Sequence, residues 1–257
     1  VENTSGSPHV ISTSGNITIN GILRGVEVSS LGGPQTGNGG NITLTTSSGV
    51  ILVGTTGLIN VNATQAGGNG GIVTLNGPTI TIDGSISANG LTSGAGGRIN
   101  MTGSNININS LANIQARGMQ AGALGGQIDI DSTALTNIAN GAVLSTSGTH
   151  SSGSNNFISI QGAGVNVDGL LNAQGISTGR GGEIEITATS GADEVFIQSN
   201  GQLLASSAGG NGGEIRYTGN AIQEGSSQVH TGASGYNGGT ITITGGASDN
   251  FTMQNGG

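Results

Sequence analysis

Short stretches in which apolar and polar residues alternate recur along the chain at regular intervals. The clearest stretch has the form Gly-Gly-x-aliphatic-x-aliphatic. Its copies begin at Gly39 (GGNITL), Gly70 (GGIVTL), Gly96 (GGRINM), Gly125 (GGQIDI), Asn155 (NNFISI, a degenerate copy), Gly181 (GGEIEI), Gly212 (GGEIRY) and Gly238 (GGTITI). Successive copies start 26 to 31 residues apart. Alternation with a period of two places the aliphatic residues on one face of a β-strand, so each copy predicts one strand.

Two further alternating segments recur within each unit. In the second segment two apolar residues flank a central residue that is polar in most copies. The copies are Ile17-Thr18-Ile19, Ile80-Thr81-Ile82, Ile106-Asn107-Ile108, Val165-Asn166-Val167 and Val195-Phe196-Ile197. The third pairs a branched aliphatic residue with a smaller one two positions later: Ile59/Val61, Ile86/Ala88, Ile114/Ala116, Val143/Ser145, Leu171/Ala173, Leu203/Ala205 and Val229/Thr231. Asn, Asp, Gly and Ser separate the segments, and these residues favour turns.

Three short strands per unit, separated by turn residues, predict an all-β fold: a single-stranded parallel β-helix, or β-solenoid, with three strands per coil. We expect one domain over residues 1–257, made of a lead-in coil over 1–38 and eight repeat starts over 39–257. This gives about nine coils, of which the last is incomplete. At the strand spacing of about 4.8 Å, they would form a rod roughly 43 Å long.

The first strand of each coil predicts a ladder of inward apolar residues. Its members are Ile42, Val73, Ile99, Ile128, Ile158, Ile184, Ile215 and Ile241. The position two residues later is also apolar in every copy and includes Tyr217, which we therefore expect to point inward. A lone coil cannot bury enough apolar surface to offset the entropy of ordering its residues, so the coils must stack in order to fold.

Composition and charge narrow the function classes. The chain has 53 Gly among 257 residues, 7% charged residues, no Cys and a net charge of −8. Its negative charge and lack of Lys disfavour nucleic-acid binding, and no apolar run reaches the ~18 residues of a membrane helix. His9, His150 and His230 lie in unrelated places, so the sequence predicts no metal site, no cofactor and no nucleophilic triad. The chain begins at Val1 without Met, which predicts a processed or excised product.

The outward positions of the first strands carry the best candidate for a catalytic cluster. Its members are Asp129, Glu183, Glu185 and Glu214, with Arg98 and Arg216 nearby. We expect Glu185 and Arg216 to be neighbours on adjacent coils, within reach of an ion pair. Such an acidic face is compatible with a polysaccharide-degrading enzyme, or it is only a solvated face with weak ion pairs. We expect no enzyme, because the chain has no Lys and few Arg to neutralise an acidic substrate.

The corner before each Gly pair and the ends of the rod leave further alternatives open. The corners are long, variable and rich in Gly and Ser, which predicts flexibility. Either they form an edge that binds a ligand, or their sequence varies only because Gly and Ser tolerate such variation. Phe157 and Tyr236 are the plausible exposed rings, which is few for sugar binding by ring stacking. No capping helix is visible at either end, so the chain is either part of a longer array or pairs end to end into a fibre.

The sequence pattern of the repeats resembles that of a known group of proteins. The phrase Gly-Gly-Glu-Ile-x-x…Val-x-Ile-x-x-x-Gly-x-Leu-x-Ala-Ser…Gly-Asn-Gly-Gly, from Gly181 to Gly213, is similar to the repeats of filamentous-haemagglutinin-like bacterial exoproteins of the two-partner-secretion type. The resemblance covers the chain from about Ile17 to Met253. It implies a right-handed parallel β-helix that is secreted to the bacterial cell surface or matrix as an adhesin or scaffold. It also implies no catalytic residues. As partners we expect another copy by end-to-end association, or covalent continuation of the array, and a cell-surface or glycan receptor.

Overall fold

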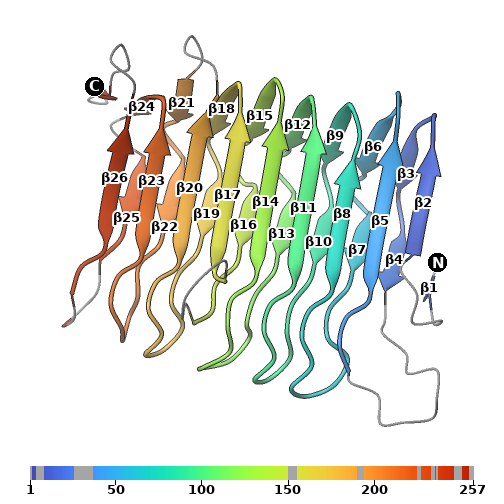
Figure 1. Cartoon of the computed structure of the whole chain (residues 1–257), viewed down its shortest axis with the longest axis horizontal. Coiled ribbons are helices and arrows are strands. Elements are labelled where there is room, and N and C mark those ends of the chain that lie inside the picture. Colours follow the sequence, from blue (N-terminus) through green and yellow to red (C-terminus); the bar gives the residue numbers. More distant parts are fainter. Residues whose placement is uncertain are drawn as a thin grey trace.

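The computed structural model describes residues 2–3, 9–25, 37–149, 155–189, 194–224, 227–232, 235, 237–245 and 251–254. Over these residues the protein is all-β, without a helix, and its strands form three parallel sheets (Figure 1). Each sheet contains nine described strands, and each successive strand in a sheet comes from the next coil of the chain. The predicted β-solenoid with three strands per coil is confirmed.

The strands have the following bounds. The first sheet contains β2 (His9–Thr13), β5 (Asn41–Thr46), β8 (Ile72–Asn76), β11 (Arg98–Gly103), β14 (Gln127–Ser132), β17 (Phe157–Gly162), β20 (Glu183–Ala188), β23 (Glu214–Thr218) and β26 (Thr240–Thr244). The second contains β3 (Ile17–Ile19), β6 (Val50–Val53), β9 (Thr79–Ile82), β12 (Asn105–Ile108), β15 (Leu135–Ile138), β18 (Gly164–Val167), β21 (Glu194–Ile197), β24 (Asn220–Glu224) and β27 (Phe251–Gln254). The third contains β1 (Glu2–Asn3), β4 (Ile22–Gly25), β7 (Leu58–Asn60), β10 (Ser85–Ser87), β13 (Asn113–Gln115), β16 (Val143–Ser145), β19 (Leu170–Asn172), β22 (Gln202–Leu204) and β25 (Gln228–His230).

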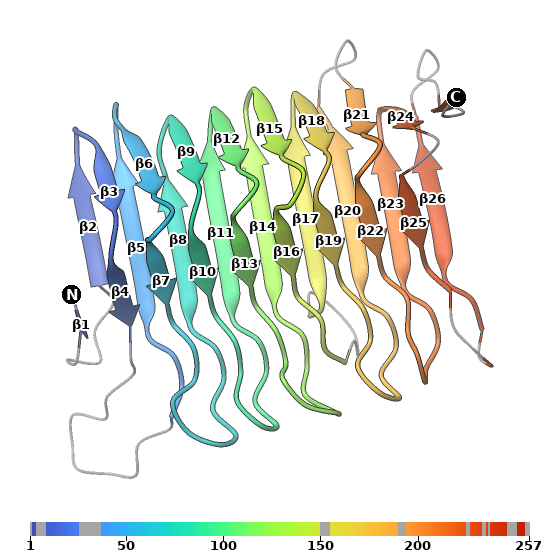
Figure 2. The same cartoon turned by 180° about the vertical axis from the view of Figure 1, so that it is seen from behind.

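The coil is right-handed. In Figure 1 the first sheet faces the viewer and its strands run upward, while the other two sheets lie behind it. The chain advances from β2 at the right to β26 at the left, and Figure 2 shows the same course from behind. This is the hand that a parallel strand-to-strand crossover normally adopts.

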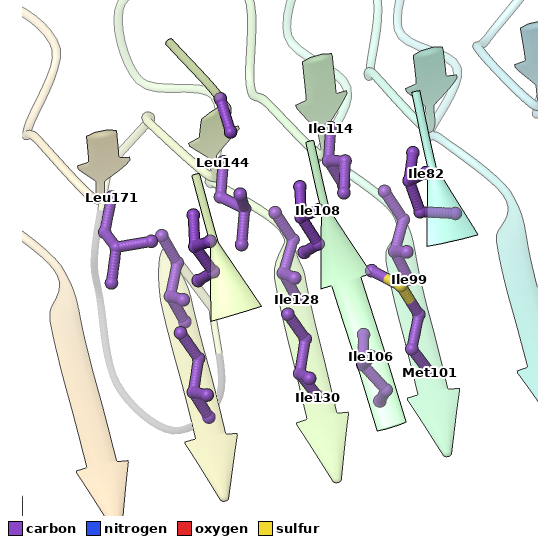
Figure 3. Close-up of a cluster of buried hydrophobic side chains, with 14 of the residues drawn as sticks. Ile82, Ile99, Met101, Ile106, Ile108, Ile114, Ile128, Ile130, Leu144 and Leu171 are labelled. Atoms are coloured by element: carbon purple, nitrogen blue, oxygen red, sulfur yellow. The ribbon is translucent and has the colours of Figure 1, made fainter. Parts of the chain in front are cut away.

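The core is the space enclosed by the three sheets (Figure 3). Seven members of the inward ladder, from Ile42 to Ile215, have no exposed surface. The eighth, Ile241, is in register with Ile215 but 48% exposed. It differs because β26 has a neighbouring strand, β23, on one side only among the described residues. Tyr217 is buried as expected, and this burial raises the pKa of its hydroxyl.

One predicted pair of the third strands is out of register. The sequence suggested Val143 and Ser145 as the inward residues of β16, but the inward aliphatic residue is Leu144. It is paired with Ile114 on one side and Leu171 on the other. Two consecutive aliphatic residues leave a one-residue ambiguity, and a one-residue shift reverses every side chain in a strand. The neighbouring coils fix the register.

Close backbone contacts at the corner between the third sheet and the first explain the Gly-Gly pairs. At the second Gly of a pair, the N–H donates to the carbonyl of the residue that follows the preceding third strand. Gly71 donates to Val61 and Gly97 donates to Ala88, both at 2.7 Å. A Cβ on Gly97 would lie 2.0 Å from the carbonyl oxygen of Gly71, so no side chain fits there.

The first Gly of a pair is equally confined by the next coil, except Gly238 in the last pair, which has open space around its Cβ position. A Cβ on Gly70 would lie 2.0 Å from the carbonyl oxygen of Ala88, and one on Gly96 would lie 2.3 Å from that of Ala116. Two columns of Gly therefore run along this corner and let the backbones of successive coils approach each other. Each pair also closes the base of the loop that precedes it.

These closed loops stack into a projection that we call the fin, made of residues 62–70, 89–96, 117–125, 174–181 and 206–212. It forms the lower edge of the rod in Figures 1 and 2. Backbone hydrogen bonds join loops of adjacent coils, as from Ala63 to Asn89 and from Gly90 to Arg117, both at 2.9 Å. Asn69 adds a side-chain link by accepting from the N–H of Ala95 at 2.8 Å. The corners that the sequence suggested were flexible are thus tied together across coils.

We predict that Gly97→Ala destabilises the rod by about 3 kcal/mol, because the new methyl group meets a backbone carbonyl that the sheets hold in place. Gly21 has open space around its Cβ position and serves as the control. Gly21→Ala should change the free energy of unfolding by less than about 0.5 kcal/mol. Denaturant unfolding measures both, and equal stability of the two variants would contradict the steric account.

We further predict that Val73→Asp prevents folding or costs about 4 kcal/mol or more, because it places an unpaired carboxylate in the core. The matched control is the adjacent Thr74→Asp, whose side chain faces outward between Thr43 and Asn100. Circular dichroism and denaturant unfolding should show a folded, near-native control. A folded Val73→Asp protein would refute the assignment of the inward face.

Candidate functional site

The outer face of the first sheet carries the charged residues singled out from the sequence, but they form two separate groups. In the first group, the Arg98 guanidinium pairs with Asp129 at 2.9 Å. Arg98 Nε also donates to Asn100 Oδ1 at 2.7 Å. The second oxygen of Asp129 accepts from Gln127 Nε2 at 2.9 Å. Both carboxylate oxygens of Asp129 therefore have a donor from the protein itself.

The second group is centred on Arg216. Its guanidinium binds Glu214 on the same strand through two hydrogen bonds, of 2.8 and 2.7 Å, and lies 3.7 Å from Glu183. The hydrogen bonds to Glu214 are the main reason that the pKa of Arg216 is raised, followed by the charges of Glu214, Glu183 and Glu185. Because that pKa rises from an already high value, its contribution to stability is fully present at neutral pH and is lost only in strong base.

The expected ion pair between Glu185 and Arg216 is replaced by these contacts. The two residues are register partners on adjacent strands, as the sequence suggested. Two-residue spacing along one strand, however, brings Glu214 to the same face, and its two oxygens match the fork of the guanidinium. Asp129 and Glu185 are separated by an intervening strand, where Ser159 lies between them. Both Arg are paired within the face, and the four carboxylates leave it with a net negative charge.

The other candidate groups stay dispersed. His9 lies on β2 and His230 on β25, and His150 lies outside the described residues. Within the described part of the chain, no three or more His, Cys, Asp or Glu residues are grouped so that they could hold a metal ion. No helix suited to crossing a membrane occurs there either.

A ladder of amides and hydroxyls runs along the junction between the third sheet and the fin. Asn62 Oδ1 accepts from Ser87 Oγ and from the N–H of Asn89, both at 2.7 Å. The Asn89 amide then donates to Ser87 Oγ and to Gln115 Oε1. Arg117 continues the ladder by donating to Ser147 Oγ at 2.8 Å. These groups satisfy one another, so they stabilise the stacking of the coils.

Two hollows lie at the edges of the first sheet. One, of about 370 Å³, is at the corner with the second sheet and is lined by Thr, Ser, Asn, Gly and Pro residues of successive coils. The other, of about 290 Å³, lies in the angle between the first sheet and the fin, and we call it the fin groove. It is lined by Ile72, Ala95, Gly96, Gly97, Arg98, Leu124, Gly125, Gly126, Gln127 and Asn155.

The sequence does not predict the fin groove, because a hollow between loops and a sheet leaves no periodic pattern in the sequence. One local signal does exist. At residues 155–156 an Asn pair replaces the Gly pair, and Phe157 follows at an outward position. Phe157 is half-buried next to Gln127, and Tyr236 lies outside the described residues.

We predict that Arg216→Gln lowers stability by about 1 kcal/mol at pH 7, because Glu183 and Glu214 then face each other across adjacent strands without a cation. Salt screens that repulsion, so the deficit should shrink as the salt concentration rises to about 1 M, where the Debye length is about 3 Å. Thermal unfolding of variant and wild type over that range of salt measures it. The control is Arg98→Gln, which leaves Asp129 without its cation but between the uncharged partners Asn100 and Ser159, and which should show little recovery with salt. A deficit at Arg216 that salt leaves unchanged would contradict the account.

Comparisons with known proteins add no assignment: no family model, curated protein or solved structure matches this chain.

Proposed function

We propose that the chain is a non-enzymatic structural and adhesive β-solenoid, secreted to the bacterial cell surface or matrix, of the filamentous-haemagglutinin-like type. The observation that carries this proposal is the unbroken stacking of all three sheets from β2 to β26, in parallel and in register. A fold of this kind builds a long, regular surface from one repeated unit, which suits a scaffold or an adhesin.

The state of the charged groups supports this function over the alternative of a polysaccharide-degrading enzyme. General acid–base catalysis needs carboxyl groups that can reach a substrate. Here Asp129 and Glu214 are each held by an Arg and by hydrogen bonds on their own face. Asp129 and Glu185 are also separated by a whole intervening strand, β17.

The outermost coils support continuation of the rod. On β26, Ile241 and Ile243 point inward and are 48% and 41% exposed. At the opposite end, Ile11 on β2 is only partly buried against the core. All strands run in parallel, so the β26 end of one rod can add to the β2 end of another with the sheets continuing. Such a head-to-tail contact does not close on itself, and it generates a filament.

We predict that electron microscopy and sedimentation of the native chain show rods associated end to end. The double variant Ile241→Lys, Ile243→Lys should stay folded but sediment as single rods, because charges on an edge strand oppose strand addition. The control is Thr240→Lys, at an exposed outward position of β26, which should still associate.

Three results would overturn the proposal. The first is association that the double variant leaves unchanged, and the second is a native chain that stays as single rods under all conditions. The third is cleavage of an acidic polysaccharide by the wild-type chain that is lost in Glu185→Gln, which would instead support the enzyme.

A further inference from the structure

The fifth Gly-pair position departs from the rule that governs the others. Asn156 occupies the place of the second Gly, and it adopts a φ of 54°, a left-handed conformation that is rare for a residue with a side chain. Its side chain is buried and fully bonded. Oδ1 accepts from Thr146 Oγ1 at 3.1 Å, and Nδ2 donates to the carbonyls of Gly148 and Ala173, each at 3.1 Å. Departures from an otherwise consistent pattern are concentrated at functional sites.

This departure lies at the fin groove. Asn155, the first residue of the pair, lines the groove, and Phe157 follows immediately as the first residue of β17. Phe157 is register partner to Gln127, which also lines the groove. Its neighbours Ile158 and Asn156 are buried, so alternation directs the Phe157 ring to the outer face. The Phe157 ring is therefore the next outward side chain beyond the groove along the rod axis.

The groove combines apolar surface with hydrogen-bonding groups. Ile72 is 40% exposed, and Leu124 adds a second aliphatic side chain from the fin. Gln127, Asn155 and Arg98 supply amide and guanidinium groups. The Gly pairs leave the floor free of side chains, so a ligand can approach the backbone closely. A pyranose ring has both kinds of surface, because its C–H face packs on apolar or aromatic groups and its hydroxyls accept and donate hydrogen bonds.

Charge decides which kind of glycan fits. Arg98 is the cation of the groove, and it is already paired with Asp129. Beyond Phe157 the same outward row continues with Glu183. The net charge of the whole chain is −8. An anionic polymer would therefore meet no unpaired cation in the groove and a negative field around it.

We propose that the fin groove, together with Phe157, binds a neutral linear glycan that lies along the rod axis. Phe157 stacks on one sugar ring, Ile72 and Leu124 contact its neighbours, and Gln127 and Asn155 bond hydroxyl groups. This inference deepens the adhesive part of the proposed function and rests on it, since it gives the solenoid a ligand class.

The test is titration calorimetry of the full chain with cellohexaose and laminarihexaose as neutral probes and an oligogalacturonate hexamer as the acidic probe. At least one neutral probe should bind, and Phe157→Ala should weaken that binding tenfold or more. Phe157→Trp should retain it. The matched control is Phe196→Ala, which removes a half-buried outward ring from the second sheet and should change the affinity less than twofold.

Circular dichroism and thermal unfolding of each variant exclude misfolding as the cause of lost binding. The inference is overturned if neither neutral probe binds, if the acidic hexamer binds more tightly, or if Phe196→Ala weakens binding as much as Phe157→Ala. End-to-end association is measured separately, by sedimentation. Loss of glycan binding with association intact therefore removes the groove proposal alone.

Discussion

The rod depends on close approach of backbone to backbone at the corner between the third and first sheets. There the N–H of one Gly donates to the carbonyl of the residue that follows the preceding third strand, at 2.7 Å, in coil after coil. Any Cβ at these Gly positions would lie inside the contact distance of a neighbouring carbonyl oxygen. The recurring Gly pairs, which are costly in entropy, are thus explained by hydrogen bonds that a larger residue would prevent.

The fin and the fin groove follow from this constraint. Because each Gly pair closes the base of a loop, the loop residues project together, and their backbones hydrogen-bond from coil to coil. The groove is the angle between these loops and the first sheet, and its floor is open where the Gly pairs lie. The fifth position shows the cost of departing from Gly: Asn156 is accommodated only with a positive φ and a buried, fully bonded amide.

Alternation along single strands was enough to predict the β-solenoid, since an inward residue such as Ile128 has apolar partners at the same position in both adjacent coils. The prediction failed at β16, where two aliphatic residues in succession removed the alternation that sets the register. Other features could not be read from the pattern. Side-chain geometry led Arg216 to Glu214 instead of Glu185, and the ordered fin depends on contacts between loops whose sequences differ.

Residue-resolved hydrogen exchange of the native chain tests the central claim most directly. The amides of Gly71, Gly97, Gly126, Gly182 and Gly213 each donate a 2.7 Å hydrogen bond at the corner. They should exchange about as slowly as amides in the middle of the sheets, while that of Gly122, at an exposed tip of the fin, should exchange quickly. Fast exchange at all five Gly residues would mean that the corners are loose connections, and would contradict the account.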